Sequence, residues 1–134
     1  GAHLGEAGVA SLKRGHSLIL FPAGTRSRPG KPLDFYRGAA QVAVRSGCDI
    51  LPVVIRCEPL ALGRHQAWHE VPDRPWQLTL RFCPPRSLAE LDCRDDMPHG
   101  VAARHATRAM QAFFTQQLAG QDSAGQTGAD TQAA

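Results

Sequence analysis

The sequence has few cysteines, and no two of them have the spacing of a metal-binding pair. Its 4 cysteines, in 134 residues, are Cys48, Cys57, Cys83 and Cys93. This set is too sparse for a disulfide-built scaffold, and the absence of Cys-x-x-Cys removes a common signature of zinc and thiol-redox sites. We therefore expect reduced thiols, as in a cytosolic protein.

Apolar runs of membrane-spanning length are missing as well. A transmembrane helix needs about 20 consecutive apolar residues, and the apolar runs at residues 17–21 and 50–55 are far shorter. The sequence also has no signal peptide and no start methionine. We expect it to be part of a longer chain, which leaves open an anchor upstream.

Charge of one sign is not strongly in excess. The formal net charge is +3 and the sequence pI is about 8.9, a mild basic balance that suits anionic substrates or lipid headgroups. With no recognised nucleic-acid-binding module and only 1 tyrosine for base stacking, we expect no nucleic acid as a partner. Several basic residues instead gather in one stretch with Gly and Pro, at Arg26, Arg28, Lys31 and Arg37.

The first part of the chain predicts alternating helices and strands. The predicted elements are a helix over residues 4–13, a strand over 17–21, a loop over 23–32, a helix over 34–46 and a strand over 50–55. Gly15 and Gly47 are placed to end the two helices, and Asp34 to cap the second. A strand–helix–strand order predicts two parallel strands with a right-handed crossover. Strands that are apolar almost throughout fit a sheet covered on both faces.

The second part of the chain predicts a strand and a long helix. An irregular segment over residues 59–75 is followed by an alternating strand over 76–82 and by a helix over 101–118 with one apolar stripe. We predict an α/β fold, a two-layer or three-layer and mostly parallel sheet with flanking helices. Its single domain covers residues 1–119, and residues 120–134 are expected to be a disordered tail.

Chemistry-bearing residues follow the first predicted strand directly. Residues 21–27 read Phe-Pro-Ala-Gly-Thr-Arg-Ser, just beyond the carboxyl end of that strand, where open α/β sheets hold their ligands. Gly24 allows close backbone approach, Thr25 and Ser27 offer hydroxyl donors, and the Arg26 fork can hold a phosphate through two hydrogen bonds. From residue chemistry alone, a solvated basic turn remains the alternative.

Two weaker motifs are set aside. The stretch does not match a nucleotide-binding P-loop, because 5 residues separate Gly24 from Gly30. His65 and His69 have the spacing of one helix face, but no third metal ligand has a defined position. We therefore expect no metal site and no cofactor.

Three blocks in order resemble the lysophosphatidic acid acyltransferase family. Residues 21–27 are similar to that family's Phe-Pro-Glu-Gly-Thr-Arg-Ser block. Asp-Phe-Tyr-Arg-Gly-Ala at 34–39 resembles its Phe-Lys-Gly-Ala stretch, and Ile-Leu-Pro-Val-Val-Ile at 50–55 resembles its block with a Val-Pro-Val core. The resemblance covers roughly residues 10–60 and corresponds to the C-terminal part of the family's domain.

The resemblance implies an α/β enzyme that moves an acyl chain from acyl-CoA or acyl carrier protein to a hydroxyl of a lysophospholipid-like acceptor. It implies that Gly24, Thr25 and Arg26 bind the acceptor's phosphate. Residues expected to shape the site are Ala23, Ser27, Arg37, Gly38 and Pro52. A protein of this family is expected to be cytoplasmic and peripheral to the cytoplasmic membrane, with the membrane surface as a partner.

Two departures from the family pattern matter. The family's base is a His-x-x-x-x-Asp motif, and none of the 6 histidines here is followed by Asp at the fifth position. We therefore expect no catalytic residue in this chain and no activity from it alone. Ala23 stands where the family has Glu, so nothing at that position can balance Arg26. Two rivals stay open, a non-catalytic remnant that binds a phosphorylated ligand and a half domain that binds a partner.

Overall fold

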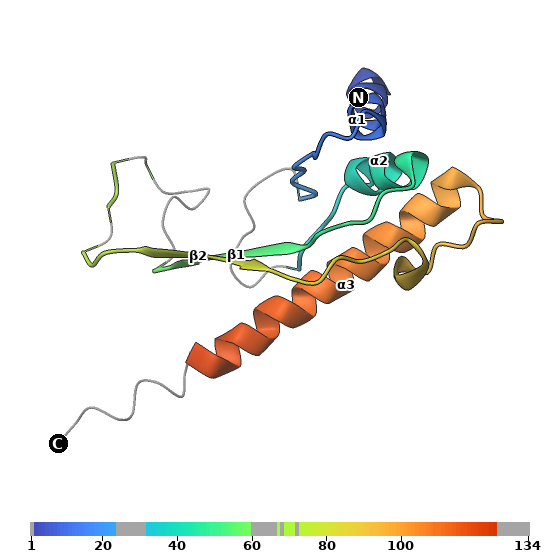
Figure 1. Cartoon of the computed structure of the whole chain (residues 1–134). Helices are drawn as coiled ribbons and strands as arrows, with labels where there is room; N and C mark the ends of the chain where they lie inside the picture. The colour runs from blue at the N-terminus through green and yellow to red at the C-terminus, as the bar shows by residue number, and fades with distance from the viewer. Residues whose placement is uncertain (1, 24–31, 60–66, 68, 72, 126–134) are drawn as a thin grey trace.

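The computed structural model describes residues 2–23, 32–59, 67, 69–71 and 73–125. Its elements are α1 (Ala2–Lys13), α2 (Gly38–Ser46), β1 (Val53–Glu58), β2 (Gln77–Phe82), a short 3-10 helix η1 (Ala89–Leu91) and α3 (His99–Gly125). Helix α2 lies between α1 and the long helix α3, and the β1–β2 ribbon extends away from α1 and α2 while its β1 strand contacts α3 (Figure 1).

Helix α1 ends at Gly15, as the sequence predicts. Gly15 has a φ of 87°, in the left-handed region that favours glycine. Its N–H donates to the Leu12 carbonyl over 2.9 Å, and the His16 N–H donates to the Ser11 carbonyl over 3.2 Å. These bonds satisfy carbonyls that the last helical turn leaves without a partner.

Residues 17–21, predicted as a buried strand, are not a strand in the structure. Within the part of the chain that is described, no other segment pairs with them. Ile19 and Phe21 are 82% and 73% exposed, while Leu18 is partly covered. The strand prediction was wrong because apolar composition favours a strand, whereas forming one requires a neighbour that takes up the backbone hydrogen bonds.

Helix α2 begins later than predicted and ends where predicted. Asp34 precedes the helix by several residues, and Arg37 occupies the N-cap position without a side-chain hydrogen bond to the helix. At the other end Gly47 has a φ of 69° and donates its N–H to the Ala43 carbonyl over 2.9 Å. Gly47 is therefore the left-handed C-cap that the sequence indicates.

The described sheet is antiparallel, so the predicted parallel pair is wrong for these residues. Strand β1 pairs with β2 from Val53 opposite Phe82 to Glu58 opposite Gln77. The pairing extends as an isolated bridge between Ile50 and Arg86. The predicted strand–helix–strand unit is absent because its first strand finds no partner, and the two later strands pair with each other instead. Helices and a sheet are both present, as an α/β fold requires, but the described sheet has only two strands.

The core lies between α2, η1 and α3. Its buried side chains are those of Ala40, Leu91, Ala103, Ala106 and Met110. Alanines at the contact let α2 and α3 approach closely, because a methyl group fills little space between two helix backbones. Phe35 and Phe114 pack beside them edge to face, with ring centroids 5.6 Å apart.

The C-terminal helix is longer than predicted. Helix α3 begins at His99 and continues past Gly120, the predicted start of the tail, to Gly125; residues 126–134 lie outside the described ones. Of the predicted stripe, Ala102, Ala106 and Met110 are buried. All 4 cysteines are free. Among the helices that the structure describes, none combines the length and apolar character needed to cross a membrane.

Candidate functional site

The predicted phosphate-binding loop joins the apolar segment at residues 17–21 to helix α2. Gly24, Thr25, Arg26 and Ser27 lie outside the described residues, so their role stays a prediction. The structure does describe the two flanks of the loop, where Ala23 and Arg37 lie. The geometry of the candidate site is therefore defined by these flanks.

One backbone hydrogen bond brings the flanks of the loop together. The Tyr36 N–H donates to the Pro22 carbonyl over 2.8 Å. Ala23 follows this bond on one side, and Arg37 follows it on the other. The two described flanks thus meet beside the first turn of α2.

The first turn of α2 presents free backbone donors next to this loop. Its first intrahelical bond runs from the Gln41 N–H to the Arg37 carbonyl over 2.8 Å. Among the described residues, no backbone carbonyl accepts from the N–H groups of the preceding helical residues, and the Arg37 side chain does not cap them. Gly38 is exposed, and a methyl group built on it would meet nothing within 4 Å. The helix start is therefore open to an anion, which the helix dipole favours at this end.

The described flanks carry one basic residue, Arg37, and one acidic residue, Asp34, and these two form no ion pair with each other. Arg37 is exposed and forms no ion pair with any acidic residue that the structure describes. Ala23 is partly buried, and its methyl group accepts no hydrogen bond. The positive end of the helix dipole and the Arg37 guanidinium thus lie at the same end of the segment.

Pro52 is fully buried at the start of the ribbon. Its carbonyl accepts a hydrogen bond from the Cys83 N–H over 2.9 Å. Proline has no N–H of its own, so it suits a position next to the isolated Ile50–Arg86 bridge, before the regular ladder begins. Pro52 thus holds the ribbon together, and its part in the wall of the site stays a prediction.

A histidine–carboxylate pair that the sequence analysis did not single out joins η1 to α3. The His105 Nδ1 lies 2.9 Å from the Asp92 Oδ2. Asp92 has a φ of 60°, a left-handed conformation that Asp adopts more readily than most residues. Beside it, burial raises the pKa of the Cys93 thiol, whose Sγ donates to the Ala102 carbonyl over 3.3 Å. Cys93 therefore stays a thiol, and the pair has no thiolate nucleophile next to it.

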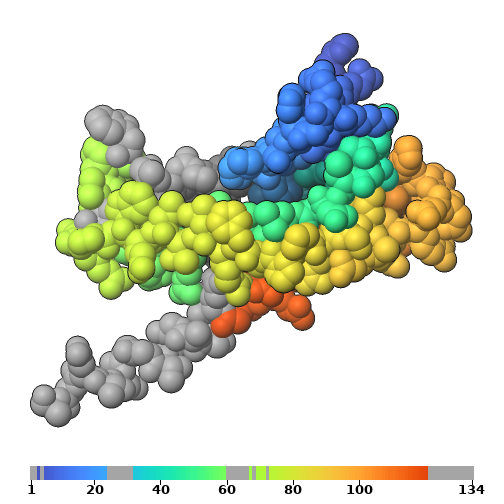
Figure 2. All heavy atoms as spheres, in the orientation of Figure 1, coloured from blue at the N-terminus to red at the C-terminus, as the bar shows by residue number. Residues whose placement is uncertain are grey.

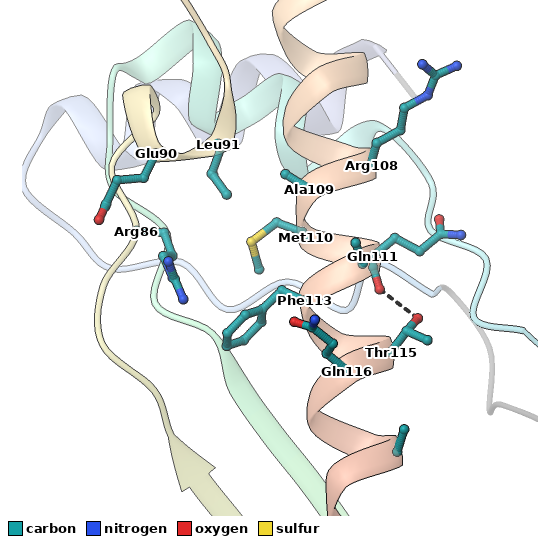
Figure 3. A pocket seen from close by; sticks show the side chains of 12 residues that line it. Arg86, Glu90, Leu91, Arg108, Ala109, Met110, Gln111, Phe113, Thr115 and Gln116 are labelled. Atoms are coloured by element: carbon teal, nitrogen blue, oxygen red, sulfur yellow. Dashed lines mark hydrogen bonds between the residues drawn. The ribbon is translucent and has the colours of Figure 1, made fainter.

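A broad groove runs along α3, away from the residues that the sequence singles out. It encloses about 760 Å³ between the Arg86–Leu91 segment and α3. Arg86 lies over the Phe113 ring, 4.9 Å from its centroid, and Met110 points toward Leu91 (Figure 3). The Arg86 Nε is buried and has no hydrogen-bond partner. With Glu90 and Arg108 at its rims, the groove holds no pair of titratable groups placed for proton transfer.

Metal chemistry has no support in the described residues. No group of His, Cys, Asp and Glu side chains among them is arranged to hold a metal ion. His65 lies outside the described residues, so the set-aside pair with His69 is not placed.

Comparison with known proteins gives related sequences for most of the chain. Residues 2–56 match the family model described as Acyltransferase. The 1-acyl-sn-glycerol-3-phosphate acyltransferase of Limnanthes douglasii is 38% identical over 107 residues, which cover 75% of this chain and 36% of that protein. The protein of the same name from Cocos nucifera is 31% identical over 103 residues. These residues cover 75% of this chain and 31% of the Cocos nucifera protein. The chain thus spans about a third of the length of these relatives. No solved structure matches it.

Proposed function

We propose, because this chain belongs to the acyltransferase family, that it is part of an enzyme that transfers an acyl chain to a hydroxyl of a lysophosphatidic acid-like acceptor. The relatives' names supply the acceptor, since they are 1-acyl-sn-glycerol-3-phosphate acyltransferases. The donor is acyl-CoA or acyl carrier protein. The enzyme works at the cytoplasmic membrane surface, where such acceptors are found.

The observation that carries this proposal is the hydrogen bond that brings the two described flanks of the predicted phosphate-binding segment together at the start of α2. This bond, from the Tyr36 N–H to the Pro22 carbonyl, holds the two flanks next to the first turn of α2. A phosphate monoester carries up to two negative charges and several acceptor oxygens, which suits guanidinium and backbone donors together. The phosphate of the acceptor is the group that we assign to this loop.

The catalytic base is proposed to come from a segment outside this sequence. General-base removal of the hydroxyl proton needs a positioned histidine, and no His-x-x-x-x-Asp motif occurs in these 134 residues. The same absence favours the alternative function, a domain that binds a phosphorylated ligand without catalysis. The activity of the protein made from the complete coding sequence separates the two.

The test is steady-state kinetics of that complete protein with substituted basic residues. Arg26→Ala is expected to lower kcat/KM for the phosphorylated acceptor by about 10-fold to 100-fold, because a charged hydrogen-bond partner of the phosphate is lost. Arg26→Lys should recover part of the loss, since an ammonium keeps the charge but not the two-pronged geometry. Arg28→Ala is the matched control, expected to act weakly and mainly at low ionic strength. If Arg26→Ala is no worse than Arg28→Ala, the phosphate is bound elsewhere.

A further inference from the structure

The β1–β2 ribbon has one face that is almost entirely apolar. On this face Ile55 lies directly opposite Leu80, and the neighbouring pairs are Val53 with Phe82 and Cys57 with Leu78. Ile55 and Leu80 are 48% and 49% exposed, and Phe82 is 67% exposed. Side chains of this kind are ordinarily the ones that a sheet buries.

The other face of the ribbon is more polar, and it is the face that α3 contacts. Val54 is 2% exposed there, and the Arg81 guanidinium donates to the Gln117 side chain of α3. The pairs beyond them are Arg56 with Thr79 and Glu58 with Gln77. A two-stranded sheet that is stable alone would turn its apolar face inward and its polar face to water. Here the arrangement is reversed, which indicates that the apolar face is the inner face of something larger.

A second uncovered feature is the segment at residues 17–21. The side chains of Ile19 and Phe21 are largely exposed, and no described segment takes up the backbone hydrogen bonds of residues 17–21. Strand β2 likewise has the ribbon's β1 on one edge only. Its atoms, yellow-green in Figure 2, lie at the surface of the molecule in that view.

We propose that the apolar ribbon face and the segment at residues 17–21 form a docking surface for another segment of a longer acyltransferase chain. That segment supplies at least one extended strand, which pairs with residues 17–21 or with the open edge of β2. It also supplies an apolar helix face, which covers Ile55, Leu80 and Phe82.

Chain length points to this occupant. The chain covers 36% of the Limnanthes douglasii relative and 31% of the Cocos nucifera relative, so about two thirds of each lies outside the matched region. A lipid surface fits the features less well. Hydrocarbon covers apolar side chains but leaves the N–H and C=O groups of an open strand edge without partners, which is costly. A protein segment with a strand satisfies both needs.

The test compares two adjacent positions of β2. Leu80 lies on the apolar face and Thr79 on the polar face, and both are exposed in this chain. The full chain is produced together with the remainder of the Limnanthes douglasii relative, the part outside the 107 matched residues. We expect the unchanged chain and Thr79→Glu to co-purify with it. We expect Leu80→Glu to lose at least about 10-fold in recovery, because a carboxylate would be buried without a partner.

Exchange of backbone hydrogens and two further measurements complete the test. Bound partner should slow exchange at residues 17–21 and 77–82. A thermal melt of each variant alone should match that of the unchanged chain, since both positions are exposed, and it separates lost docking from lost folding. The inference is overturned if Leu80→Glu co-purifies as well as Thr79→Glu, or if nothing co-purifies. It is also overturned if Leu80→Glu instead abolishes binding to phosphatidylcholine–phosphatidylglycerol vesicles, or converts a dimer of this chain to a monomer.

This inference rests on family membership and sheet geometry, and acyl transfer is not needed for it. Co-purification of a catalytically silent complex would support the docking surface and count against the proposed function. Acyl transfer by the complete protein, with no loss of co-purification for Leu80→Glu, would support the proposed function and count against the docking surface.

Discussion

At the scale of single residues, two glycines of α1 show opposite surroundings. A methyl group built on Gly8 would lie 3.1 Å from the Leu18 Cδ2 and 3.5 Å from the Val42 Cγ1. The same group on Gly5 would meet nothing within 4 Å. Both residues lie inside a helix, where glycine costs conformational entropy. Gly8 therefore keeps room for Leu18 and α2, whereas Gly5 has no such packing role.

Substitution of these glycines is expected to separate the effect of helix propensity from the effect of packing against Leu18. Gly5→Ala should raise the free energy of unfolding by about 0.5–1 kcal/mol, the usual advantage of Ala over Gly within a helix. Gly8→Ala should gain less, because Leu18 has to shift. Gly8→Val should lower it by about 1–3 kcal/mol through overpacking. Urea unfolding measures all three, and equal effects at both positions would mean that Leu18 does not pack on Gly8 in solution.

Residue-level prediction from the sequence succeeded where the cause is local. Gly15 and Gly47 end their helices because a left-handed backbone is a property of the residue itself. The prediction that Asp34 caps α2 was wrong because residues far away in the sequence position this segment. The neighbouring Phe35 packs on Phe114, and its N–H donates to the Gln111 side chain over 3.4 Å. These contacts hold the chain in an extended course, so the helix starts after Arg37.

At the scale of elements, the turn before η1 is held by a reciprocal cap. The Ser87 N–H donates to the Glu90 Oε2 over 2.8 Å, and the Glu90 N–H donates to the Ser87 hydroxyl over 3.3 Å. This is a capping box. The N–H and hydroxyl of Ser87 lower the pKa of the Glu90 carboxyl below its ordinary value.

The cap should make part of the chain's stability depend on pH. Because the pKa of Glu90 is lower in the folded chain, the ionised carboxylate stabilises it above the ordinary value of 4.5, and this contribution disappears as the pH falls through the folded-state pKa. The Glu90→Gln variant should therefore have a lower melting temperature than the unchanged chain at pH 7. The difference between the two melting temperatures should disappear in acid. Thermal melts from pH 7 to pH 3 measure it. A difference in melting temperature that does not change with pH would mean that the charge of Glu90 does not contribute to stability.

The contact of α2 with α3 depends on small side chains. Ala106 is 0% exposed, and it belongs to the same buried cluster as Ala40. Ala106→Leu should lower the free energy of unfolding by about 1–3 kcal/mol, because the larger side chain forces the helices apart. Ala112→Leu is the control on the same helix at an exposed position, expected within about 0.5 kcal/mol of the unchanged chain. Equal losses would show that α3 does not pack on α2 through this face.

Helices were predicted better than strand pairing, and the reason is physical. An amphipathic helix satisfies its own backbone, so the period around Ala102 and Ala106 is enough to identify α3. A strand needs a neighbour, and its direction relative to that neighbour is set by packing that no single segment encodes. The segment at residues 76–82 was therefore predicted as a strand, but its antiparallel pairing with β1 was not.

At the scale of the whole molecule, charge and apolar surface are divided between two regions. Arg37 lies at the start of α2, and the uncovered apolar side chains lie on the ribbon and on the segment at residues 17–21. The resemblance to the family placed the phosphate loop in the sequence, and its residues Gly24 to Ser27 remain predictions. The resemblance to the family could not predict the Asp92–His105 pair, since nothing in the spacing of these residues marks them as partners.

The last prediction is that this chain alone has no acyltransferase activity. A positioned general base contributes about 10²-fold to 10⁴-fold in rate, and the family's His-x-x-x-x-Asp motif is absent from the sequence. The assay follows release of free thiol from acyl-CoA with lysophosphatidic acid as acceptor, and a complete relative serves as the positive control. The Asp92–His105 pair joins a histidine to a carboxylate, so substitution of this histidine provides a direct check. Turnover near about 10 s⁻¹, a typical enzyme rate, would contradict the proposal that the base lies outside this chain. If His105→Ala then abolished that turnover, the base would be this histidine.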